Sequence, residues 1–296
     1  MRRFSRVRLA AVGSVLACLL ALAPVLPASA TSTSNSHPNT YLALGDSVPF
    51  GYNPVLLQKL LQSGGTPVNP SAFVGYPQLA ANLFRPKLKV FNASCPGETS
   101  GSLINMTARD NGCQSYRQLI GALHVSYRGS QLQYAESYLT ANPRTKLVSL
   151  MIGANDLFLL QDSCAQAADV DGCILAGLPG LLSTLRANLK TIYKGLRATG
   201  FKGDFLAVTY YSTNYRDPVV TGAVGAVDLV LAGVTLAFRG KVADGFGAFA
   251  RAAAPFGGDT CATGLLIHLP SGACDVHPTR AGAALLASAV HAAEGR

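Results

Sequence analysis

Short apolar runs alternate with stretches of helical periodicity along most of the chain, and this alternation is the strongest constraint on its fold. The strand-like runs are Thr40–Gly45, Lys87–Ala93, Thr145–Gly153 and Gly203–Ser212. Apolar residues recur at helical spacing in Tyr76–Phe84, Gln131–Ala141, Leu178–Ala198, Val242–Ala253 and Thr279–Ala293. Strands that alternate with helices build a parallel sheet covered by helices on both faces. We therefore expect one α/β domain over residues 40–296.

The polar residues of interest lie directly after the strand-like runs. In parallel sheets of this kind, ligands bind outside the carboxyl ends of the strands. The first run is followed by Gly45-Asp46-Ser47, the second by the segment NASCPGET at 92–99, and the third by GAND at 153–156. A fourth segment, CDVHPT at 274–279, precedes the last helical stretch. Each of these segments supplies one component of an acyl-transfer site.

A serine hydroxyl is a weak nucleophile at neutral pH and needs an adjacent base, which is usually histidine. Ser47 and His277 are the candidates for these roles. The backbone N–H groups of Ser47 and Gly97 and the side-chain amide of Asn155 are candidate donors to the oxyanion of a tetrahedral intermediate. Two plainer interpretations compete: Ser47 as an ordinary turn residue, and Asn155 as a helix N-cap. Asp46 is expected to cap or brace its turn.

These four segments, in this order, resemble the SGNH (GDSL) hydrolase family over nearly the whole chain after residue 30. The resemblance implies a three-layer α/β/α sandwich with a parallel, flavodoxin-like sheet of five strands. It also implies a serine esterase or lipase of the secreted bacterial type, with Ser47, Gly97, Asn155 and His277 as its catalytic set. The chain contains no G-x-S-x-G sequence, which argues against the nucleophile elbow of the α/β-hydrolases.

One position departs from the family pattern. The family usually has its catalytic aspartate three residues before the histidine, where this chain has Cys274, and Asp275 lies only two residues before His277. Three arrangements are open: Asp275 orients the imidazole, a backbone carbonyl near Cys274 does so, or the site is a Ser-His dyad. If Asp275 serves, it holds the imidazole in the correct tautomer and stabilises the imidazolium.

The N-terminus indicates export. Residues 1–30 have a basic start (MRRFSRVR), an apolar middle and the small-residue cleavage site Ala28-Ser29-Ala30, which is typical of a secretory signal peptide. Residues 31–39 are polar and are expected to form a flexible tail. We expect cleavage after Ala30 and an extracellular protein.

The six cysteines after the leader are expected to form disulfides, because an even number in an exported chain is typical of them. Sequence alone leaves fifteen pairings open. We favour nearest neighbours, since each pair would close one local loop: Cys95–Cys113, Cys164–Cys173 and Cys261–Cys274. A zinc site is the competing interpretation, but the chain has no C-x-x-C pair, and we expect no metal. His268 is expected to be a partly buried residue without a catalytic role.

The charge and hydropathy of the chain bear on whether it binds nucleic acid or crosses a membrane. Without the four arginines of the leader, the formal charge falls from +9 to +5, with 20 Lys and Arg against 15 Asp and Glu. The chain has no Lys/Arg run and no Trp, so we expect no nucleic-acid binding. The segment Val219–Phe238 is long enough to span a bilayer, but it lies inside the expected domain. We therefore expect a buried or cleft-lining helix rather than a membrane span.

Together these observations predict a secreted, monomeric serine esterase or lipase that acts on small-molecule or lipid esters without a cofactor. The apolar segment 219–238, with Phe246, Phe249 and Phe256, is expected to form an acyl-binding wall, which favours lipid esters. Two alternatives remain open. The same site could serve a carbohydrate O-acetylesterase or an acyltransferase. The chain could also be a catalytically inactive surface-binding protein on a hydrolase scaffold.

Overall fold

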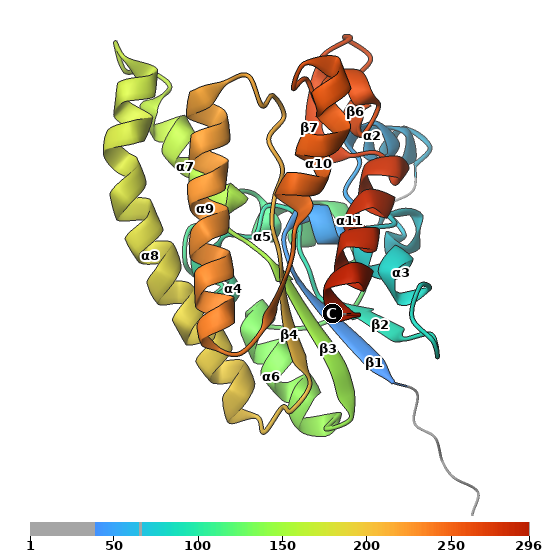
Figure 1. Cartoon of the computed structure of the whole chain (residues 1–296). Coiled ribbons are helices and arrows are strands. Elements are labelled where there is room, and N and C mark those ends of the chain that lie inside the picture. Colours follow the sequence, from blue (N-terminus) through green and yellow to red (C-terminus); the bar gives the residue numbers. More distant parts are fainter. Residues whose placement is uncertain (1–38, 65–66, 296) are drawn as a thin grey trace, which may run out of the picture. The chain divides into compact units, whose positions relative to one another are not determined.

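The computed structural model describes residues 39–64 and 67–295, so the predicted signal peptide at 1–30 and nearly all of the predicted tail at 31–39 lie outside the described residues. Five parallel strands form the central sheet in the order β2-β1-β3-β4-β5 (Figure 1). They are β1 (Thr40–Gly45), β2 (Lys89–Asn92), β3 (Thr145–Met151), β4 (Asp204–Val208) and β5 (Lys241–Ala243). This is the flavodoxin-like strand order, and it confirms the predicted fold class.

Helices cover both faces of the sheet and complete the three layers (Figure 1). One face carries α6 (Gln131–Ala141), α8 (Val170–Ala198) and α9 (Pro218–Ala237), and the other carries α3 (Tyr76–Ala81), α10 (Gly245–Ala253) and α11 (Arg280–Glu294). The sequence explains which side of each helix faces the sheet. In α8 the buried residues Leu185, Leu189, Ile192 and Leu196 recur at helical spacing and form one apolar stripe.

Shorter elements gather after the carboxyl ends of the strands. They include α1 (Ser47–Phe50), α2 (Pro54–Gln62), α4 (Ser100–Ile104), α5 (Cys113–Ser115), the π-helical turn η2 (Tyr116–Ile120) and α7 (Ala154–Cys164). Three 3₁₀ turns are η1 (Pro70–Ala72), η3 (Ala254–Phe256) and η4 (Cys261–Thr263). Near the C-terminus, β6 (Leu266–His268) and β7 (Cys274–Pro278) form an antiparallel pair.

One predicted helix is wrong in its first part. The stretch Val242–Ala253 was predicted as a single helix, but it begins in β5, and α10 starts only at Gly245. Asp244 separates the two elements, because its side chain accepts a hydrogen bond from the N–H of Gly247 and so caps α10. A three-residue strand at the sheet edge is too short to show an alternating pattern.

The apolar segment after β4 forms α9, which packs on α8 and against β4 and β5. Asp228, the one charged residue in α9, is buried. By length and composition, α9 is the single helix among the described residues that could cross a membrane. Its inner side belongs to the folded core, and its outer side exposes Leu229 and Leu236. The prediction of a buried or cleft-lining helix agrees with this packing.

Candidate active site

Ser47 lies at the carboxyl end of β1, where the strand passes into α1. Gly45 has a φ of +134°, and a Cβ there would lie 2.0 Å from the carbonyl oxygen of Met151, so only glycine fits this turn. The buried Asp46 caps α1 by accepting a hydrogen bond from the N–H of Val48 at 3.0 Å. Ser47 is therefore the first residue of α1, in a rigid turn above the sheet.

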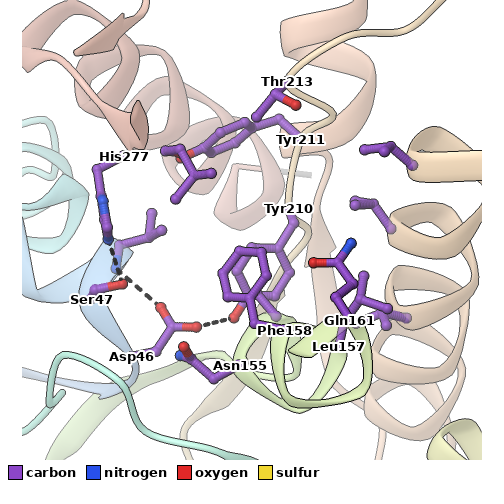
Figure 2. Close-up of a pocket in the computed structure, with 16 residues that line it drawn as sticks. Asp46, Ser47, Asn155, Leu157, Phe158, Gln161, Tyr210, Tyr211, Thr213 and His277 are labelled. Atoms are coloured by element: carbon purple, nitrogen blue, oxygen red, sulfur yellow. Dashed lines mark hydrogen bonds between the residues drawn. The ribbon is translucent and has the colours of Figure 1, made fainter. Parts of the chain in front are cut away.

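His277 and Asp275 lie on β7 and face Ser47. The Nε2 atom of His277 is 2.8 Å from the Oγ atom of Ser47 (Figure 2). The Nδ1 atom of His277 is hydrogen-bonded to Oδ1 of Asp275, which also accepts the backbone N–H of His277 at 2.9 Å. Residues two apart on a strand point to the same face, which explains how an aspartate at this unusual spacing reaches the ring.

The charge state of Asp275 follows from these contacts. Burial by itself would raise the pKa of Asp275, but the hydrogen bonds from His277 and its charge outweigh burial, so the pKa lies below the ordinary value. Asp275 is therefore ionised at neutral pH. Of the three arrangements left open by the sequence, the geometry matches the one in which Asp275 contacts the imidazole.

Three contacts hold the strand that carries His277. The disulfide Cys261–Cys274 ties the start of β7 to η4. The Tyr211 hydroxyl donates a 2.7 Å hydrogen bond to the carbonyl oxygen of Val276. The ring of Tyr52 lies 4.9 Å from the imidazole of His277, centroid to centroid.

Gly97 lies in a loop that the disulfide Cys95–Cys113 fastens. Its φ is +83°, and a Cβ at this position would lie 2.4 Å from the carbonyl oxygen of Asn111. Glycine is therefore required both for the backbone conformation and for the close approach of the two loops. Gly97 lines a cavity together with Ser47, Asn155 and His277.

Asn155 lies in the first turn of α7, after Gly153 with its φ of +124°. Its Nδ2 donates to the carbonyl oxygen of Glu98 at 2.9 Å, and its Oδ1 accepts from Nδ2 of Asn111 at 2.9 Å. These two bonds orient the amide and leave one of its two N–H donors for a ligand. The neighbouring Asp156 instead accepts two hydrogen bonds from Ser100, at the start of α4.

A buried polar brace that the sequence did not reveal links these segments. Gln131, at the start of α6, donates to the carbonyl oxygen of Gly45 at 2.9 Å and accepts its N–H at 2.6 Å. It also donates to Glu98 at 3.0 Å. Burial raises the pKa of Glu98 to about 7, although hydrogen bonds from Ser102 and Gln131 act against that rise. Gln131 lies in an ordinary helical pattern, so no sequence signal distinguished it.

Tyr210 makes a second connection beneath Ser47. Its hydroxyl donates to Oδ2 of Asp46 (Figure 2). Its backbone N–H donates to Oδ1 of Asp228 at 2.7 Å. Burial raises the pKa of Asp46 to about 6 and that of Asp228 to about 8. Asp46 thus braces its turn, as expected, and is also joined to α9 through Tyr210.

Two cavities meet at Ser47 and His277. The first, called the apolar cavity here, has a volume of about 220 Å³ and is lined mainly by Val48, Leu157, Phe158, Val220, Val224, Val227 and Val276 (Figure 2). The second, called the tyrosine cavity, has a volume of about 270 Å³. Its lining includes Tyr52, Gly97, Asn111, Ser115, Tyr116 and Ile120. Ser47, Asn155, Phe158 and His277 line both cavities.

The lining of the apolar cavity includes α9 but not the phenylalanines that were predicted to join it in an acyl-binding wall. Val220, Val224 and Val227 of α9 line the apolar cavity, whereas Phe246, Phe249 and Phe256 do not. Phe249 is buried behind the wall, where it stacks on Tyr211 at 4.1 Å, and Phe256 lies on the surface. Their spacing reflects the packing of α10 and η3.

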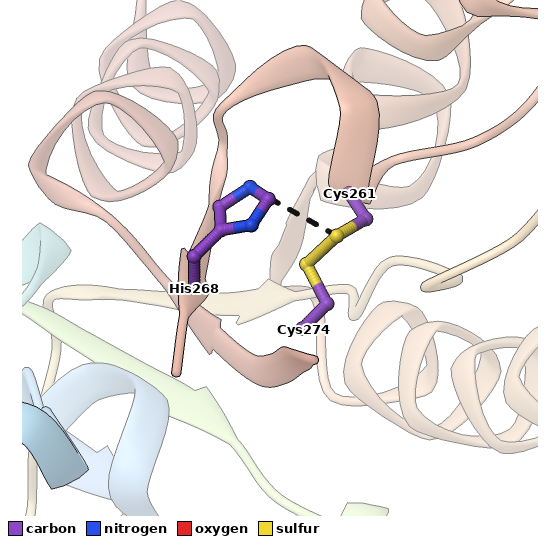
Figure 3. A group of neighbouring side chains, drawn as sticks. All are labelled: Cys261, His268 and Cys274. Carbon is purple, nitrogen blue, oxygen red and sulfur yellow. Dashed lines mark hydrogen bonds between the residues drawn. A yellow bond between two sulfur atoms is a disulfide. The ribbon is translucent and has the colours of Figure 1, made fainter. Parts of the chain in front are cut away.

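All three disulfides of the described structure are the expected nearest-neighbour pairs, including Cys164–Cys173 between α7 and α8. Two of them belong to groups with metal-ligand spacing: Cys261 and Cys274 with His268 (Figure 3), and Cys95 and Cys113 with Glu98. Cysteines joined in a disulfide offer no thiolate, so each group provides a single ordinary ligand. The expectation that His268 is partly buried is wrong, because its side chain is exposed at the end of β6.

Comparison with known proteins identifies the family of the chain and solved structures with a similar fold. The model of the GDSL-like Lipase/Acylhydrolase family matches residues 43–285. The fold is similar to phospholipase A1 from Streptomyces albidoflavus NA297, with a TM-score of 0.56 and 19% identity over 86% of this chain and 99% of that one. The fold is also similar to an extracellular lipase from Streptomyces rimosus, with a TM-score of 0.55 and 18% identity over 86% of this chain and 99% of that one.

An acetylxylan esterase from Geobacillus stearothermophilus is also similar in fold, with a TM-score of 0.50 and 18% identity over 87% of this chain and 94% of that one. No curated protein matches the chain. The family match spans more than half of the sequence and includes Ser47, Gly97, Asn155 and His277. The chain belongs to the GDSL-like lipase/acylhydrolase family.

Proposed function

We propose that this protein is a secreted serine hydrolase that cleaves carboxylic esters through an acyl-enzyme. The observation that carries the proposal is the hydrogen-bonded row of Ser47, His277 and Asp275, of which Ser47 and His277 line the apolar cavity. In this row a hydroxyl, an imidazole and a carboxylate occupy the positions that nucleophilic catalysis requires.

In the proposed reaction, Nε2 of His277 takes the proton of Ser47 as Oγ bonds to the ester carbonyl carbon. The resulting imidazolium gives that proton to the oxygen of the leaving alcohol as the ester C–O bond breaks. Water then attacks the acyl-Ser47 ester, His277 again transfers the proton, and the acid is released. Asp275, through Nδ1, keeps the imidazole in the tautomer that accepts at Nε2 and stabilises the imidazolium. These steps use no cofactor.

The proposed oxyanion donors are the N–H groups of Ser47 and Gly97 and the Nδ2 amide of Asn155. Ser47 begins α1, and N–H groups in the first turn of a helix have no partner within the helix. Asn155 is oriented by its bonds to Glu98 and Asn111, so it loses little freedom when it binds a ligand. Removal of one such donor typically lowers kcat about 10²- to 10³-fold.

The lining of the apolar cavity favours an acyl chain longer than acetyl. The valines of α9, together with Leu157 and Phe158, offer an apolar surface that extends away from Ser47. An acetyl group would leave most of this surface in contact with water, whereas a longer chain would remove apolar area from water at both partners. We therefore favour lipid esters over the carbohydrate O-acetylesterase alternative.

Export of the protein is part of the proposal. It is supported by the signal-peptide pattern of residues 1–30 and by three disulfides, which form and persist in oxidising compartments. The fold is also similar to that of an extracellular lipase. We propose one catalytic domain over residues 40–296.

The proposal is tested by hydrolysis of p-nitrophenyl esters from acetate to palmitate. The oxidised protein is compared with Ser47→Ala and with Ser137→Ala, a control at an exposed serine on α6. We expect loss of turnover only in Ser47→Ala, and higher kcat/KM for medium or long acyl chains than for acetate. A fluorophosphonate probe should label the parent protein and not Ser47→Ala. Folded protein that neither turns over esters nor reacts with the probe would support the surface-binding alternative.

A further inference from the structure

Gln131 and Glu98 form a buried polar pair that the proposed reaction does not use. They are 1% and 3% exposed, and neither lines the apolar cavity or the tyrosine cavity. Nε2 of Gln131 donates to Oε2 of Glu98 at 3.0 Å. Glu98 forms no ion pair with another described residue, and a buried carboxyl group without a counter-charge usually lowers stability. Stability alone therefore does not explain this pair.

The Gln131 side chain binds the backbone of Gly45 at the point where the ladder between β1 and β2 has ended. The last residue of β2 is Asn92, which pairs with Ala43. Oε1 of Gln131 accepts the N–H of Gly45 at 2.6 Å, and Nε2 donates to its carbonyl oxygen at 2.9 Å. A side-chain amide carries the same donor and acceptor groups as a peptide bond. Gln131 thus takes the place of a further strand residue and fixes the backbone two residues before Ser47.

The same pair also reaches the other two proposed oxyanion donors. Glu98 follows Gly97 directly, so the hydrogen bond from Gln131 to its side chain also holds the Gly97 loop. The carbonyl oxygen of Glu98 accepts from Nδ2 of Asn155 at 2.9 Å. The three donors come from segments that are far apart in the sequence. They are joined behind the site through the side chain of Gln131 and the residue Glu98.

Small displacements of these donors should have large effects on the rate. A donor stabilises an oxyanion when it lies about 2.7–3.1 Å from the position of the developing charge. A misplacement of about 1 Å, caused by a change far from the chemistry, can lower a rate about 10²-fold. The loss should appear in kcat rather than in KM, because oxyanion donors stabilise the tetrahedral state more than the bound ester.

We propose that Gln131 is a positioning residue, which holds the three oxyanion donors at their mutual spacing without touching the substrate. The inference rests on the proposed ester hydrolysis at Ser47, and it adds a residue that acts through the backbone of other segments. The competing explanation is that Gln131 only stabilises the fold. A purely structural role would reduce the number of active molecules, whereas a positioning role lowers the kcat of each active molecule.

The test uses Gln131→Met, which has a side chain of similar length and lacks the three hydrogen bonds. Gln133→Met is the matched control, because Gln133 is exposed on the same helix and accepts from the N–H of Ser130 in the capping box of α6. Full-length oxidised protein and both variants are assayed on p-nitrophenyl butyrate. Active molecules are counted by fluorophosphonate labelling of Ser47 carried to completion.

We expect kcat per labelled molecule to fall about 10²-fold in Gln131→Met, with KM changed by less than about threefold. Gln133→Met should lower the thermal unfolding temperature, because α6 loses part of its cap, and should leave kcat and KM unchanged. A loss of less than about tenfold in kcat per labelled molecule of Gln131→Met would overturn the inference.

Two inhibitors separate the tetrahedral state from the ground state. Oγ of Ser47 can add to the carbonyl carbon of an alkyl trifluoromethyl ketone, while His277 takes the proton and the carbonyl oxygen becomes an oxyanion. The matching alkyl methyl ketone serves as a ground-state ligand. In Gln131→Met, binding of the trifluoromethyl ketone should weaken by about the same factor as kcat, and binding of the methyl ketone should not change. Equal weakening of both ketones would contradict a positioning role.

A double variant tests whether Gln131 acts through the donors. Asn155→Ala removes one of them, and misplacement of a donor that is absent has no effect. The loss of kcat in Gln131→Met/Asn155→Ala should therefore be smaller than the product of the two single losses. Losses that multiply would contradict the inference.

Gln131→Asn provides a second variant if Gln131→Met does not fold. It keeps an amide but is one methylene shorter, so it cannot pair with Gly45 and reach Glu98 together, and it should show the same split between kcat and KM. The parent protein and Ser47→Ala separate the two claims. If the parent cleaves the ester and Ser47→Ala does not, the proposed function stands whatever the result at Gln131.

Discussion

Replacing Asp275 with Asn tests the least usual feature of the site. Asn keeps an oxygen that can accept the backbone N–H of His277, so β7 should retain its conformation. The substitution removes the negative charge beside Nδ1, and the amide N–H₂ can instead favour the tautomer that is protonated at Nε2. His277 would then be a poorer acceptor of the proton of Ser47.

The size of the effect follows from the geometry. The side chains of His277 and Asp275 are 13% and 20% exposed, which places the pair in a partly screened environment. An ion pair at this range with an effective dielectric constant near 20 is worth about 4 kcal/mol. Because the pair is partly exposed, we take the stabilisation that Asp275 gives to the imidazolium in the transition state as about 3 kcal/mol. At 1.36 kcal/mol per factor of ten, kcat/KM should fall about 10²-fold.

The assay is hydrolysis of p-nitrophenyl butyrate from about pH 5 to pH 9. Because the pKa of Asp275 is lowered, its carboxylate is charged throughout this range. The loss in Asp275→Asn should therefore be similar at each pH. Asp171→Asn, at an exposed position in the first turn of α8, is the control and should retain full activity. A loss below about threefold would refute the role of Asp275 and favour a backbone carbonyl or a dyad.

Three further predictions concern the framework of the site. Burial raises the pKa of Asp228 to about 8, so the folded state loses stability as pH rises from about 4 to 8. Between pH 5 and pH 8 this loss amounts to at most about 4 kcal/mol, and Asp228→Asn should abolish it in urea unfolding measured at the two pH values. Val224→Phe should lower the palmitate-to-acetate ratio of kcat/KM by about tenfold, because it fills the apolar cavity; an unchanged ratio would remove α9 from the acyl site. Replacing Cys261 and Cys274 together with Ser should cost about 2–4 kcal/mol of stability by thermal unfolding and reduce turnover, because β7 carries His277; unchanged values would contradict the supporting role of this disulfide.

Local sequence patterns predicted the architecture and named most residues of the candidate site. Strand periodicity located β1 and β3, and the polar segments after them contain Ser47 and Asn155. These features can be predicted from the sequence because they depend on local chemistry: the spacing of apolar residues, glycines at sharp turns, and cysteines separated by short loops. The family resemblance rests on the same local segments. The short strand β5 was missed because three residues carry no periodic signal.

Contacts between residues far apart in the sequence could not be predicted and are known only from the folded structure. Asp275 reaches Nδ1 of His277 because residues 274–278 form a strand, a conformation that depends on pairing with β6 and on the Cys261–Cys274 disulfide. Gln131 braces the Ser47 turn from a helix 86 residues away in the sequence. The phenylalanines expected in the acyl wall do not line the apolar cavity: Phe249 is buried in the core and Phe256 is exposed. Contacts of this kind depend on packing across the fold, and local sequence patterns do not encode which side chains will meet there.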